Sequence, residues 1–488
     1  MSKRIKALAA VLVMFAFIAA FPGAKVNAEG KTKTQVINVN TAVQGMLTDD
    51  ISEIYYHFTA PADGVFYATV DKKNVTDDPS YKVRLMDSTC SKEFYSDDGT
   101  NIVTCKIGAK KGSDYYIAVA DGTFWSSATK GKPFNIKVVF ANSNNWDNEP
   151  NNSQKEARQI SVNTDYYGTA VNDDEEDYFL AIAPSDGYFV FNVSHKDITD
   201  DGSYGLEIQT ITGKEVTKDD GEKVTTYKMG VKKGQKLYVK ISGGWNAHNQ
   251  IYKLRANFTV DPCFENETNN TSKTAKVITD KKTYKGIIGN WPDDDSDYYK
   301  FTVKKTSTVS IFFGPTDISK TGKWKVALQN SKGKEAVIME TDARKTVKVK
   351  LKKGNYYIKV EANWGADEKE YQLKITSSKL NIGKKKPVIK SATVTTGGFF
   401  NNRKFTGCKI KGVKGVDGYE VKVSTNKKMK KPAITEDLTG ANKLNCEKFF
   451  NSNTKTFFVQ IRPFVKDPFG AKIYGKKSAI KKTKLKKK

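Results

Sequence analysis

Two acidic segments with matching internal spacing are the residues of this chain best suited to chemistry. Residues 147–152 read Asp-Asn-Glu-Pro-Asn-Asn, and an acidic run follows at 173–177. Residues 265–270 read Glu-Asn-Glu-Thr-Asn-Asn, and a second acidic run follows at 293–297. Carboxylate and amide oxygens are the ligands that Ca²⁺ prefers, about six to eight at a time. The spacing therefore predicts two similar sites for a hard cation.

Calcium is the expected cation because neither segment contains His or Cys, which makes zinc and copper poor candidates. The alternative is that the acidic runs are solvated turns, in which Asn151 or Asn152 only caps a turn. Five adjacent acids at 173–177 repel one another unless a cation or water screens them. This repulsion and the matched repetition favour the cation sites.

The elements that must position these acids come in three repeats. A Lys-Lys-Gly turn followed by a strand-like run occurs at 110–119, 232–239 and 352–360, and Gly45, Gly168 and Gly286 each open a strand. Short aromatic and β-branched runs between Asp, Gly and Asn turns predict antiparallel strands. We expect an all-β chain of tandem antiparallel β-sandwiches at 30–142, 146–258 and 263–379, with a brief helical turn at 153–160.

The three repeats resemble bacterial pre-peptidase C-terminal domains, a jelly-roll-like family that includes the collagen-binding domains of clostridial collagenases. In that family an acid-x-Glu-x-Asn-Asp/Asn entrance and a later Asp-x-x-Asp just before a strand bind calcium. The first repeat departs from the pattern, since Ile54 stands where the last Asp is expected, so its site is degenerate. The resemblance implies calcium ligands at Asp147, Glu149, Asn151, Asn152, Asp174, Asp177, Glu265, Glu267, Asn269, Asn270, Asp294 and Asp297.

Residues 386–486 are expected to form a fourth, smaller sandwich. Gly-Val-Asp-Gly-Tyr-Glu-Val at 415–421 resembles a fibronectin type III domain of the kind found on secreted proteins of Gram-positive anaerobes. The module departs from that family at Ile410, in the place of a tryptophan, and at Phe457 and Phe458, in the place of a tyrosine.

The positive charge of the chain is concentrated in this last module. Residues 383–488 hold 28 Lys and Arg against 6 Asp and Glu, whereas residues 29–382 are nearly neutral. Lysines dominate and no aromatic track accompanies them, which argues against nucleic acid as the partner. Screened attraction to an anionic cell-wall polymer fits better, and a solvated surface that only aids solubility is the alternative.

The first 28 residues predict a signal peptide. Lys3, Arg4 and Lys6 precede an apolar run at 7–21, and Val-Asn-Ala at 26–28 offers small residues for cleavage. An uncleaved N-terminal anchor is the alternative. No later segment approaches the length of a transmembrane helix. We therefore expect a secreted or extracellular chain, attached to the cell wall without a covalent bond.

Five cysteines in an exported chain permit two disulfides. Cys90 and Cys105 flank a predicted hairpin turn at 97–100, so a cross-strand bridge between them is a hypothesis. Cys408 and Cys446 could pair within the last module, and Cys263 has no evident partner. Buried free thiols are the alternative for each pair, because the sequence does not supply the Cα separation that a bridge needs.

Three tryptophans follow the Lys-Gly turns in Gly-, Asn- or Ser-rich surroundings, at Trp125, Trp245 and Trp364. A tryptophan on a loop beside polar residues is a platform for a sugar ring or a peptide ring. The alternative is that each one closes the end of a sandwich as core, because tryptophan is usually largely buried.

Catalysis finds little support in the sequence. His57, His195 and His248 occupy non-equivalent positions of the repeats, and motifs for zinc proteases, serine hydrolases and phosphate loops are missing. We expect a monomeric, non-catalytic binding protein whose partner is an anionic cell-wall polymer, a polysaccharide or an extracellular-matrix protein. One alternative is an adhesin that binds carbohydrate or collagen through the loop tryptophans. Another is an accessory part of an extracellular hydrolase system.

Overall fold

The computed structural model describes residues 32–486, except 74, 75, 77, 123–128, 171–175, 197–201, 290–295, 320, 321, 383–385, 399 and 400. The predicted signal peptide at 1–28 therefore lies outside the described residues. The chain divides into two compact units, which are considered separately. The first holds the described residues up to Ala181 with Phe191–Thr225 and Lys236–Ala256, and the second holds Ile182–Val190, Thr226–Gln235 and the chain from Asn257 onward.

The first repeat consists of two five-stranded sheets. The strands of one sheet, in spatial order, are β1 (Thr32–Val36), β3 (Glu53–Thr59), β9 (Asp114–Asp121), β5 (Tyr81–Met86) and β6 (Glu93–Gly99). The strands of the other are β2 (Ala42–Met46), β10 (Pro133–Asn142), β4 (Gly64–Lys72) and β7 (Asn101–Val103), with β8 (Ile107–Ala109) also pairing with β4. Most of their pairings are antiparallel, and β1 runs parallel to β3.

The second and third repeats use the same strand order. In the second repeat one sheet holds β11 (Arg158–Ile160), β13 (Glu176–Ile182), β19 (Lys236–Gly243), β15 (Tyr204–Thr210) and β16 (Glu215–Gly221). The other holds β12 (Asp165–Thr169), β20 (Ile251–Val260), β14 (Gly187–His195), β17 (Lys223–Thr225) and β18 (Met229–Val231).

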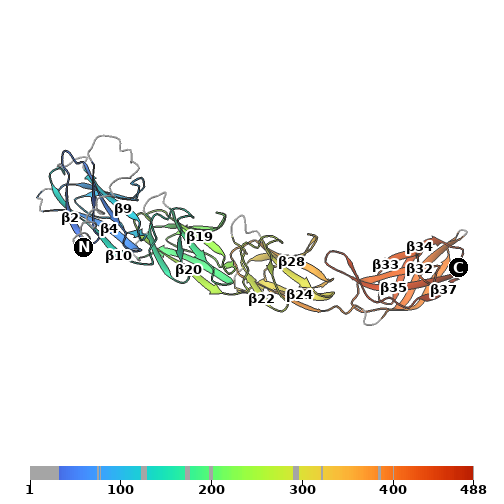
Figure 1. Ribbon diagram of the computed structural model, residues 1–488. Coiled ribbons are helices and arrows are strands. Elements are labelled where there is room, and N and C mark those ends of the chain that lie inside the picture. The colour runs from blue at the N-terminus through green and yellow to red at the C-terminus, as the bar shows by residue number, and fades with distance from the viewer. Residues whose placement is uncertain are drawn as a thin grey trace, which may run out of the picture. The chain divides into compact units, whose positions relative to one another are not determined.

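In the third repeat one sheet holds β21 (Lys276–Val277), β23 (Ser296–Val303), β28 (Gly354–Asn363), β25 (Lys323–Asn330) and β26 (Glu335–Thr341). The second sheet has four strands, β22 (Thr283–Gly286), β29 (Tyr371–Lys379), β24 (Ser307–Pro315) and β27 (Lys345–Leu351). Figure 1 labels some of these strands, β19 and β20 in the second repeat and β22, β24 and β28 in the third. The recurrence of one strand order explains why the sequence repeats at a fixed interval.

The last module is a single eight-stranded arrangement. Its strands are β30 (Val388–Thr396), β31 (Asn402–Lys411), β32 (Gly418–Ser424), β33 (Ile434–Leu438), β34 (Lys443–Asn451), β35 (Thr456–Lys466), β36 (Lys472–Tyr474) and β37 (Lys481–Lys486). Phe405, Tyr419, Val421 and Phe457 are among the residues of its buried core. The module packs on the third repeat within the same unit, where the Phe469 ring stacks on Tyr356 at 6.3 Å between centroids.

Alternating side chains build the cores. In β3 the buried residues are Ile54, Tyr56 and Phe58, and the residues between them are partly exposed. This period of two is that of a strand with one face on a core. The described residues form strands and turns but no helix, which confirms the all-β prediction. Of the brief helical turn expected at 153–160, the structure has a single turn, in which the Glu156 N–H donates to the Ser153 carbonyl. The prediction is wrong for residues 158–160, which form strand β11 instead.

The two predicted disulfides are also wrong, since all five cysteines are free. The supposed hairpin around residues 97–100 does not exist. β6 pairs with β5 in one sheet, and β7 pairs with β4 in the other, so the chain changes sheets between Cys90 and Cys105. Cys408 and Cys446 lie on the paired strands β31 and β34, but Cys408 is opposite Leu444.

No helix in the described part of the chain is long and apolar enough to cross a membrane.

Candidate metal centres

The first acidic segment forms a buried group of carboxylates. One oxygen each from Asp147, Glu149 and Asp177 lies within 4.8 Å of the others. These residues are only 1%, 1% and 2% exposed. Asp147 and Glu149 precede β11, and Asp177 is the second residue of β13. The fold therefore brings together Glu149 and Asp177, which are 28 residues apart in the sequence. We refer to Asp147, Glu149, Asn151 and Asp177 as the first carboxylate centre.

Backbone hydrogen bonds hold the entrance segment against β12 and against the start of β13. The Asp147 N–H donates to the Tyr167 carbonyl at 2.8 Å, and the Tyr178 N–H donates to the Asn151 carbonyl at 2.9 Å. Asp177 is the first inward residue of β13, in register with Phe179 and Ala181 further along the buried face. The alternation of the strand thus points a carboxylate into the sandwich end.

The polar neighbours of Asp177 are arranged around its two oxygens. The Tyr252 hydroxyl donates to Asp177 Oδ2 at 2.6 Å. The fully buried Asn151 amide lies 2.8 Å from Asp177 Oδ1 and 3.1 Å from Glu149 Oε1. With its nitrogen towards them it donates two hydrogen bonds, and with its oxygen towards them it becomes a further oxygen ligand. Asn151 can therefore serve the site with or without a cation.

The second acidic segment forms an equivalent group in the third repeat. Oxygens of Glu265, Glu267 and Asp297 lie within 4.8 Å of one another, and these residues are 0%, 6% and 0% exposed. Asp297 is again the second residue of its strand, β23. Asn269, the counterpart of Asn151, is fully buried. We refer to Glu265, Glu267, Asn269 and Asp297 as the second carboxylate centre.

The second centre leaves oxygens directed into its interior. Glu265 Oε1 accepts the Ile287 N–H at 2.6 Å, and Asp297 Oδ2 accepts the Tyr371 hydroxyl at 2.5 Å. Asp297 Oδ1 and Asn269 Oδ1 are buried and accept no hydrogen bond from the described residues. A buried oxygen without a donor costs about 1–3 kcal/mol. Two such atoms beside two more carboxylates fit a cation that uses them as ligands.

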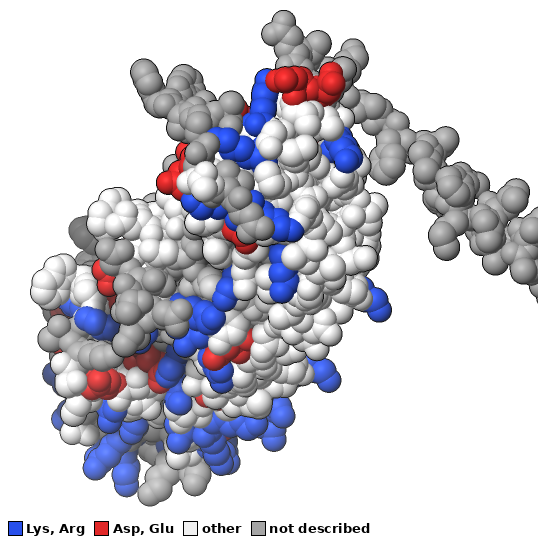
Figure 2. All heavy atoms as spheres, turned by 90° about the vertical axis from the view of Figure 1, so that its left-hand side faces the viewer, with Lys and Arg blue, Asp and Glu red and all other residues white. Residues whose placement is uncertain are grey.

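The electrostatics of both centres favour a positive ion. Burial raises the pKa of Asp297 even though the Tyr371 hydroxyl donates a hydrogen bond to it. Burial, and then the charges of Asp177 and Asp147, raise the pKa of Tyr252 well above its usual value. On the face in Figure 2, by contrast, Lys and Arg are spread over the surface with fewer Asp and Glu among them. The acids of the centres are thus set apart by their burial.

The glycines that recur in each repeat lie close to the carboxylate centres. A Cβ on Gly168 would lie 2.1 Å from the Tyr252 hydroxyl and 2.5 Å from Asp147 Oδ2. A Cβ on Gly286 would lie 2.4 Å from the Tyr371 hydroxyl. Only glycine lets the tyrosine reach the carboxylate, which explains why this glycine recurs. The prediction that these glycines open strands is wrong, because Gly168 is the last residue but one of β12 and Gly286 is the last residue of β22.

The first repeat keeps the glycine but not the acids. A Cβ on Gly45 would meet the Tyr56 hydroxyl and the Phe134 ring at 2.1 and 2.3 Å. The first inward residue of β3 is Ile54, which is 2% exposed. An apolar side chain thus fills the place that Asp177 and Asp297 take in the other repeats.

Each centre also receives contacts from the preceding repeat, within one compact unit. The Glu149 N–H donates to the Gly108 carbonyl at 3.2 Å, and the Tyr115 hydroxyl donates to the Glu149 carbonyl at 2.7 Å. In the second centre, the Glu267 N–H donates to the Gly230 carbonyl at 2.7 Å. The sequence reasoning missed Gly108 and Gly230, although each lies four residues before the glycine of a Lys-Lys-Gly turn.

The Glu267 carbonyl is the counterpart of the Glu149 carbonyl. It accepts its hydrogen bond from another kind of residue, the Gln235 side chain, at 2.8 Å. A Cβ on Gly108 would collide with Asp147, and one on Gly230 would collide with Glu265. The centres therefore lie where one repeat meets the next. Asn152 and Asn270 are half-buried beside them, and the predicted ligands Asp174 and Asp294 lie outside the described residues.

The predicted tryptophans are on the surface where they are described. Trp245 is 73% exposed and Trp364 is 86% exposed, so the alternative that they close the core is wrong for both. Each follows the end of a strand that borders a carboxylate centre. The Asn249 N–H, next to the Trp245 loop, donates to the Ala170 carbonyl at 2.8 Å. Trp125 lies outside the described residues.

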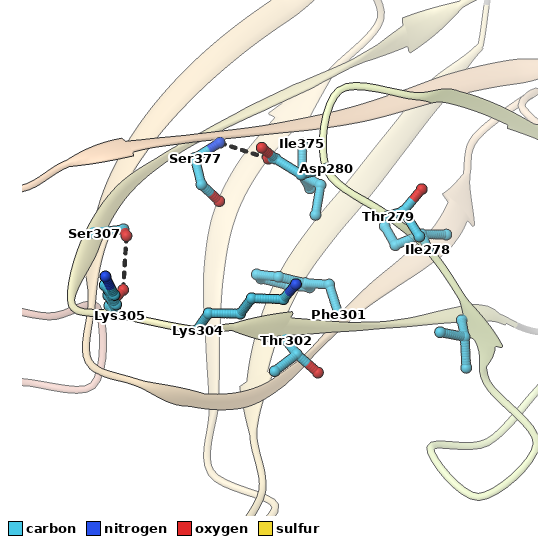
Figure 3. Close-up of a pocket in the computed structure, with 11 residues that line it drawn as sticks. Ile278, Thr279, Asp280, Phe301, Thr302, Lys304, Lys305, Ser307, Ile375 and Ser377 are labelled. Atoms are coloured by element: carbon cyan, nitrogen blue, oxygen red, sulfur yellow. Dashed lines mark hydrogen bonds between the residues drawn. The ribbon is translucent and has the colours of Figure 1, made fainter.

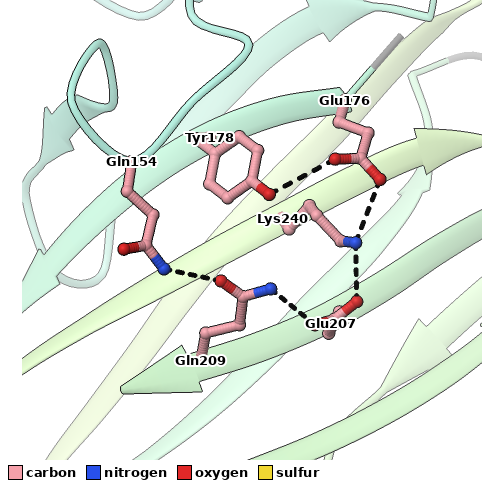
Figure 4. Close-up of polar contacts among 6 residues, drawn as sticks. All are labelled: Gln154, Glu176, Tyr178, Glu207, Gln209 and Lys240. Carbon is pink, nitrogen blue, oxygen red and sulfur yellow. Dashed lines mark hydrogen bonds and ion pairs between the residues drawn. The ribbon is translucent and has the colours of Figure 1, made fainter. Parts of the chain in front are cut away.

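A second polar cluster of the second repeat pairs its charges internally (Figure 4). Lys240 Nζ lies 2.7 Å from Glu207 and 3.0 Å from Glu176. Gln209 donates to Glu207 at 2.5 Å and accepts from Gln154 at 2.7 Å. Burial opposes the charge of Glu207, but the hydrogen bonds from Lys240 and Gln209 lower its pKa. The cluster joins strands β13, β15 and β19, and its charged side chains are paired with one another.

No protein-family model matches the chain. No curated protein matches it either. Among solved structures, it is similar to the pre-peptidase C-terminal domain of a collagenase from Bacillus anthracis, at 20% identity over 21% of this chain and 94% of that chain, with a TM-score of 0.18. It is also similar to the CUB1-EGF-CUB2 domain of human MASP-1/3, at 10% identity over 44% and 100%, with a TM-score of 0.15.

A third similar structure is that of the chicken CNTN1 FN1–FN3 domains, at 10% identity over 62% of this chain and 95% of that chain, with a TM-score of 0.19. TM-scores this low support no conclusion about this chain. What it binds must therefore be inferred from its own residues.

Proposed function

We propose that this chain is an exported, non-catalytic binding protein whose second and third repeats are stabilised by one calcium ion each. The observation that carries the proposal is the pair of buried carboxylate centres. Each gathers three carboxylates and one carboxamide at the same place in its repeat. Three acids this close and this buried are costly unless a cation compensates them.

Calcium fits the donor set better than other cations. The six carboxylates and two carboxamides of the centres are hard oxygen donors, and carbonyl groups are close by. Mg²⁺ keeps several waters and is usually bound by one or two carboxylates, which suits these buried groups less well. When bound, the ion would supply positive charge next to the three carboxylates of each centre. Asp147, Glu149, Asn151 and Asp177 would hold it in one centre, and Glu265, Glu267, Asn269 and Asp297 in the other.

The role that follows is mechanical. Glu149 and Glu267 offer a side chain to the cation and a backbone N–H and carbonyl to the preceding repeat. A bound ion would therefore fix the segment that joins two repeats as well as the strand start behind it. Calcium in this reading stiffens the junctions and leaves ligand recognition to other surfaces.

The test is calorimetric unfolding of the mature chain with EDTA and with calcium. Calcium is expected to raise the melting temperature, and native mass spectrometry is expected to find two calcium ions per chain. Melting that is unchanged by millimolar calcium would contradict the proposal. Magnesium at equal concentration is the control, with a smaller expected rise.

A second candidate function is favoured by the exposure of Trp245 and Trp364. Two tryptophans exposed at equivalent loops provide flat apolar platforms, of the kind that stack on sugar rings. This supports an adhesin for polysaccharide or an extracellular-matrix protein. The lysine-rich last module would add attraction to an anionic cell-wall polymer. If the chain is retained on polysaccharide and Trp245→Ala abolishes this retention, the result favours this candidate. If only the removal of calcium abolishes the retention, the result favours a purely structural role.

A further inference from the structure

The third repeat differs from the first two at the end of the sandwich opposite its carboxylate centre. In the first repeat Phe66 on β4 is paired with Phe140 on β10, and the two are 1% and 7% exposed. In the second repeat Phe189 and Phe258 take these places, with ring centroids 5.1 Å apart. Each pair of phenylalanines fills the space between the sheets.

The equivalent pair of the third repeat is too small to fill that space. Strands β24 and β29 pair in the same way, and the residues opposite each other there are Val309 and Ser377. A cavity of about 680 Å³ lies beside Ser377, which lines it, while Val309 is fully buried next to it in the core. Its apolar lining includes Ile278, Phe301 and Ile375. The volume falls within the range of about 300–1,000 Å³ that is common for small-molecule sites.

The rim of this cavity also differs in charge from the same place in the first two repeats. The turn before β4 reads Pro-Ala-Asp-Gly at 61–64, and the turn before β14 reads Pro-Ser-Asp-Gly at 184–187. Their aspartates, Asp63 and Asp186, accept the N–H groups of Lys111 and Lys233, each at 2.8 Å. The third repeat has Lys-Lys-Thr-Ser at 304–307 instead. The acid is lost and two lysines are gained.

The two lysines border the cavity (Figure 3). Lys304 extends across its opening in this view, and Lys305 follows it in the turn, where the Ser307 hydroxyl donates to the Lys305 carbonyl at 2.7 Å. The single carboxylate of the lining, Asp280, accepts the Ser377 N–H at 2.6 Å and so closes the edge of the sandwich. The site therefore offers an apolar floor and a rim with more positive than negative charge.

We propose that this cavity of the third repeat binds a single-chain anionic amphiphile, with the hydrocarbon chain between the sheets and the anionic head at Lys304 and Lys305. The apolar floor requires an apolar ligand body, and the exchanged turn requires a negative head. No covalent step is involved. The site is separate from the carboxylate centres, so it stands or falls independently of calcium.

Isothermal titration calorimetry of the full mature chain tests the proposal. The probes are decane-1-sulfonate, decyl maltoside with the same chain and an uncharged head, and methanesulfonate with the head alone. Decane-1-sulfonate is expected to bind saturably at one site per chain, decyl maltoside about 5-fold more weakly, the scale of exposed ion pairs, and methanesulfonate not measurably. Absence of saturable decane-1-sulfonate binding, or equally tight methanesulfonate binding, would overturn the proposal.

Two variants locate the binding. Val309→Phe with Ser377→Phe restores the filling of the first two repeats and is expected to weaken binding by at least ~10-fold, because the space is no longer open. Lys304→Ala with Lys305→Ala changes only exposed residues and is expected to weaken binding about 5-fold. Lys427→Ala with Lys428→Ala is the matched control and should bind as the parent does. Unchanged binding in the lysine variant would overturn the proposal even if the phenylalanine variant did not fold.

Discussion

Replacement of Asp177 by asparagine should have opposite effects on stability with and without calcium. Asparagine keeps the shape of the side chain, and its amide oxygen can still accept the Tyr252 hydroxyl, which is 2.6 Å away in the structure. The substitution therefore removes charge and little else. Asp147 and Glu149 lie within 4.8 Å of the charge that is removed.

The magnitude follows from this geometry. Two unit charges 4.8 Å apart repel by about 3.5 kcal/mol at an effective dielectric constant of about 20. A buried carboxyl takes up a proton before the full repulsion develops, so we expect the asparagine variant to gain at least ~1 kcal/mol without calcium. With calcium at about 1,000 times its dissociation constant, the parent centre gains about 4 kcal/mol that the variant forgoes.

These values predict crossing melting curves. About 1 kcal/mol corresponds to about 4 °C for a unit of this size. In EDTA the variant should melt ~4 °C above the parent, and in calcium more than ~10 °C below it, in the transition that contains the first carboxylate centre. Calorimetry in both buffers measures this, with Asp220→Asn on the exposed face of β16 as the matched control. A variant that melts lower than the parent by the same amount in both buffers would refute the cation site and leave Asp177 as a hydrogen-bonding residue.

The remaining predictions concern charge pairing, exposure and close approach. The folded pKa of Glu207 is lowered, so its pairing with Lys240 stabilises the fold above the unfolded pKa, and this stabilisation is lost as the pH falls through the lower, folded value. The unfolding free energies from urea titrations at pH 6 and pH 3 should therefore differ by about 1 kcal/mol more in the parent than in Glu207→Gln. Trp245→Ala and Trp364→Ala should each change unfolding free energy by less than about 0.5 kcal/mol, because both side chains are exposed, while reducing retention on polysaccharide. Gly168→Ala should cost about 1–3 kcal/mol and abolish the calcium-induced rise in melting temperature, because its Cβ would displace the tyrosine hydroxyl; melting like the parent's in calcium would contradict this.

The sequence was sufficient for the architecture because that depends on local patterns. Alternating burial in strands such as β3 follows directly from alternating side-chain type. The repeated Lys-Gly turns and the glycines at 45, 168 and 286 recur with one strand order. The kind of ligand expected at the acidic segments could also be inferred from the sequence, since carboxylates and carboxamides without His or Cys favour a hard cation.

The site geometry, the sheet to which each strand belongs and the exposure of loop residues depend on which segments meet, and only the tertiary structure shows them. Asp177 joins Glu149 only because β13 starts beside the entrance segment, and the sequence gives no distance between them. The hairpin assumed between Cys90 and Cys105 failed because strand pairing is a choice among sheets, and β6 and β7 belong to different ones. Exposure of Trp245 likewise depends on what packs over a loop.

The contrast is clearest in the cavity of the third repeat. Valine and serine at 309 and 377 are ordinary strand residues in the sequence, and only the pairing of β24 with β29 places them opposite each other where two phenylalanines stand in the other repeats. Local periodicity thus determined which elements form. The burial of charge, the exposure of tryptophan and the opening of the cavity were determined by contacts between residues far apart in the chain, because those depend on register and sheet order.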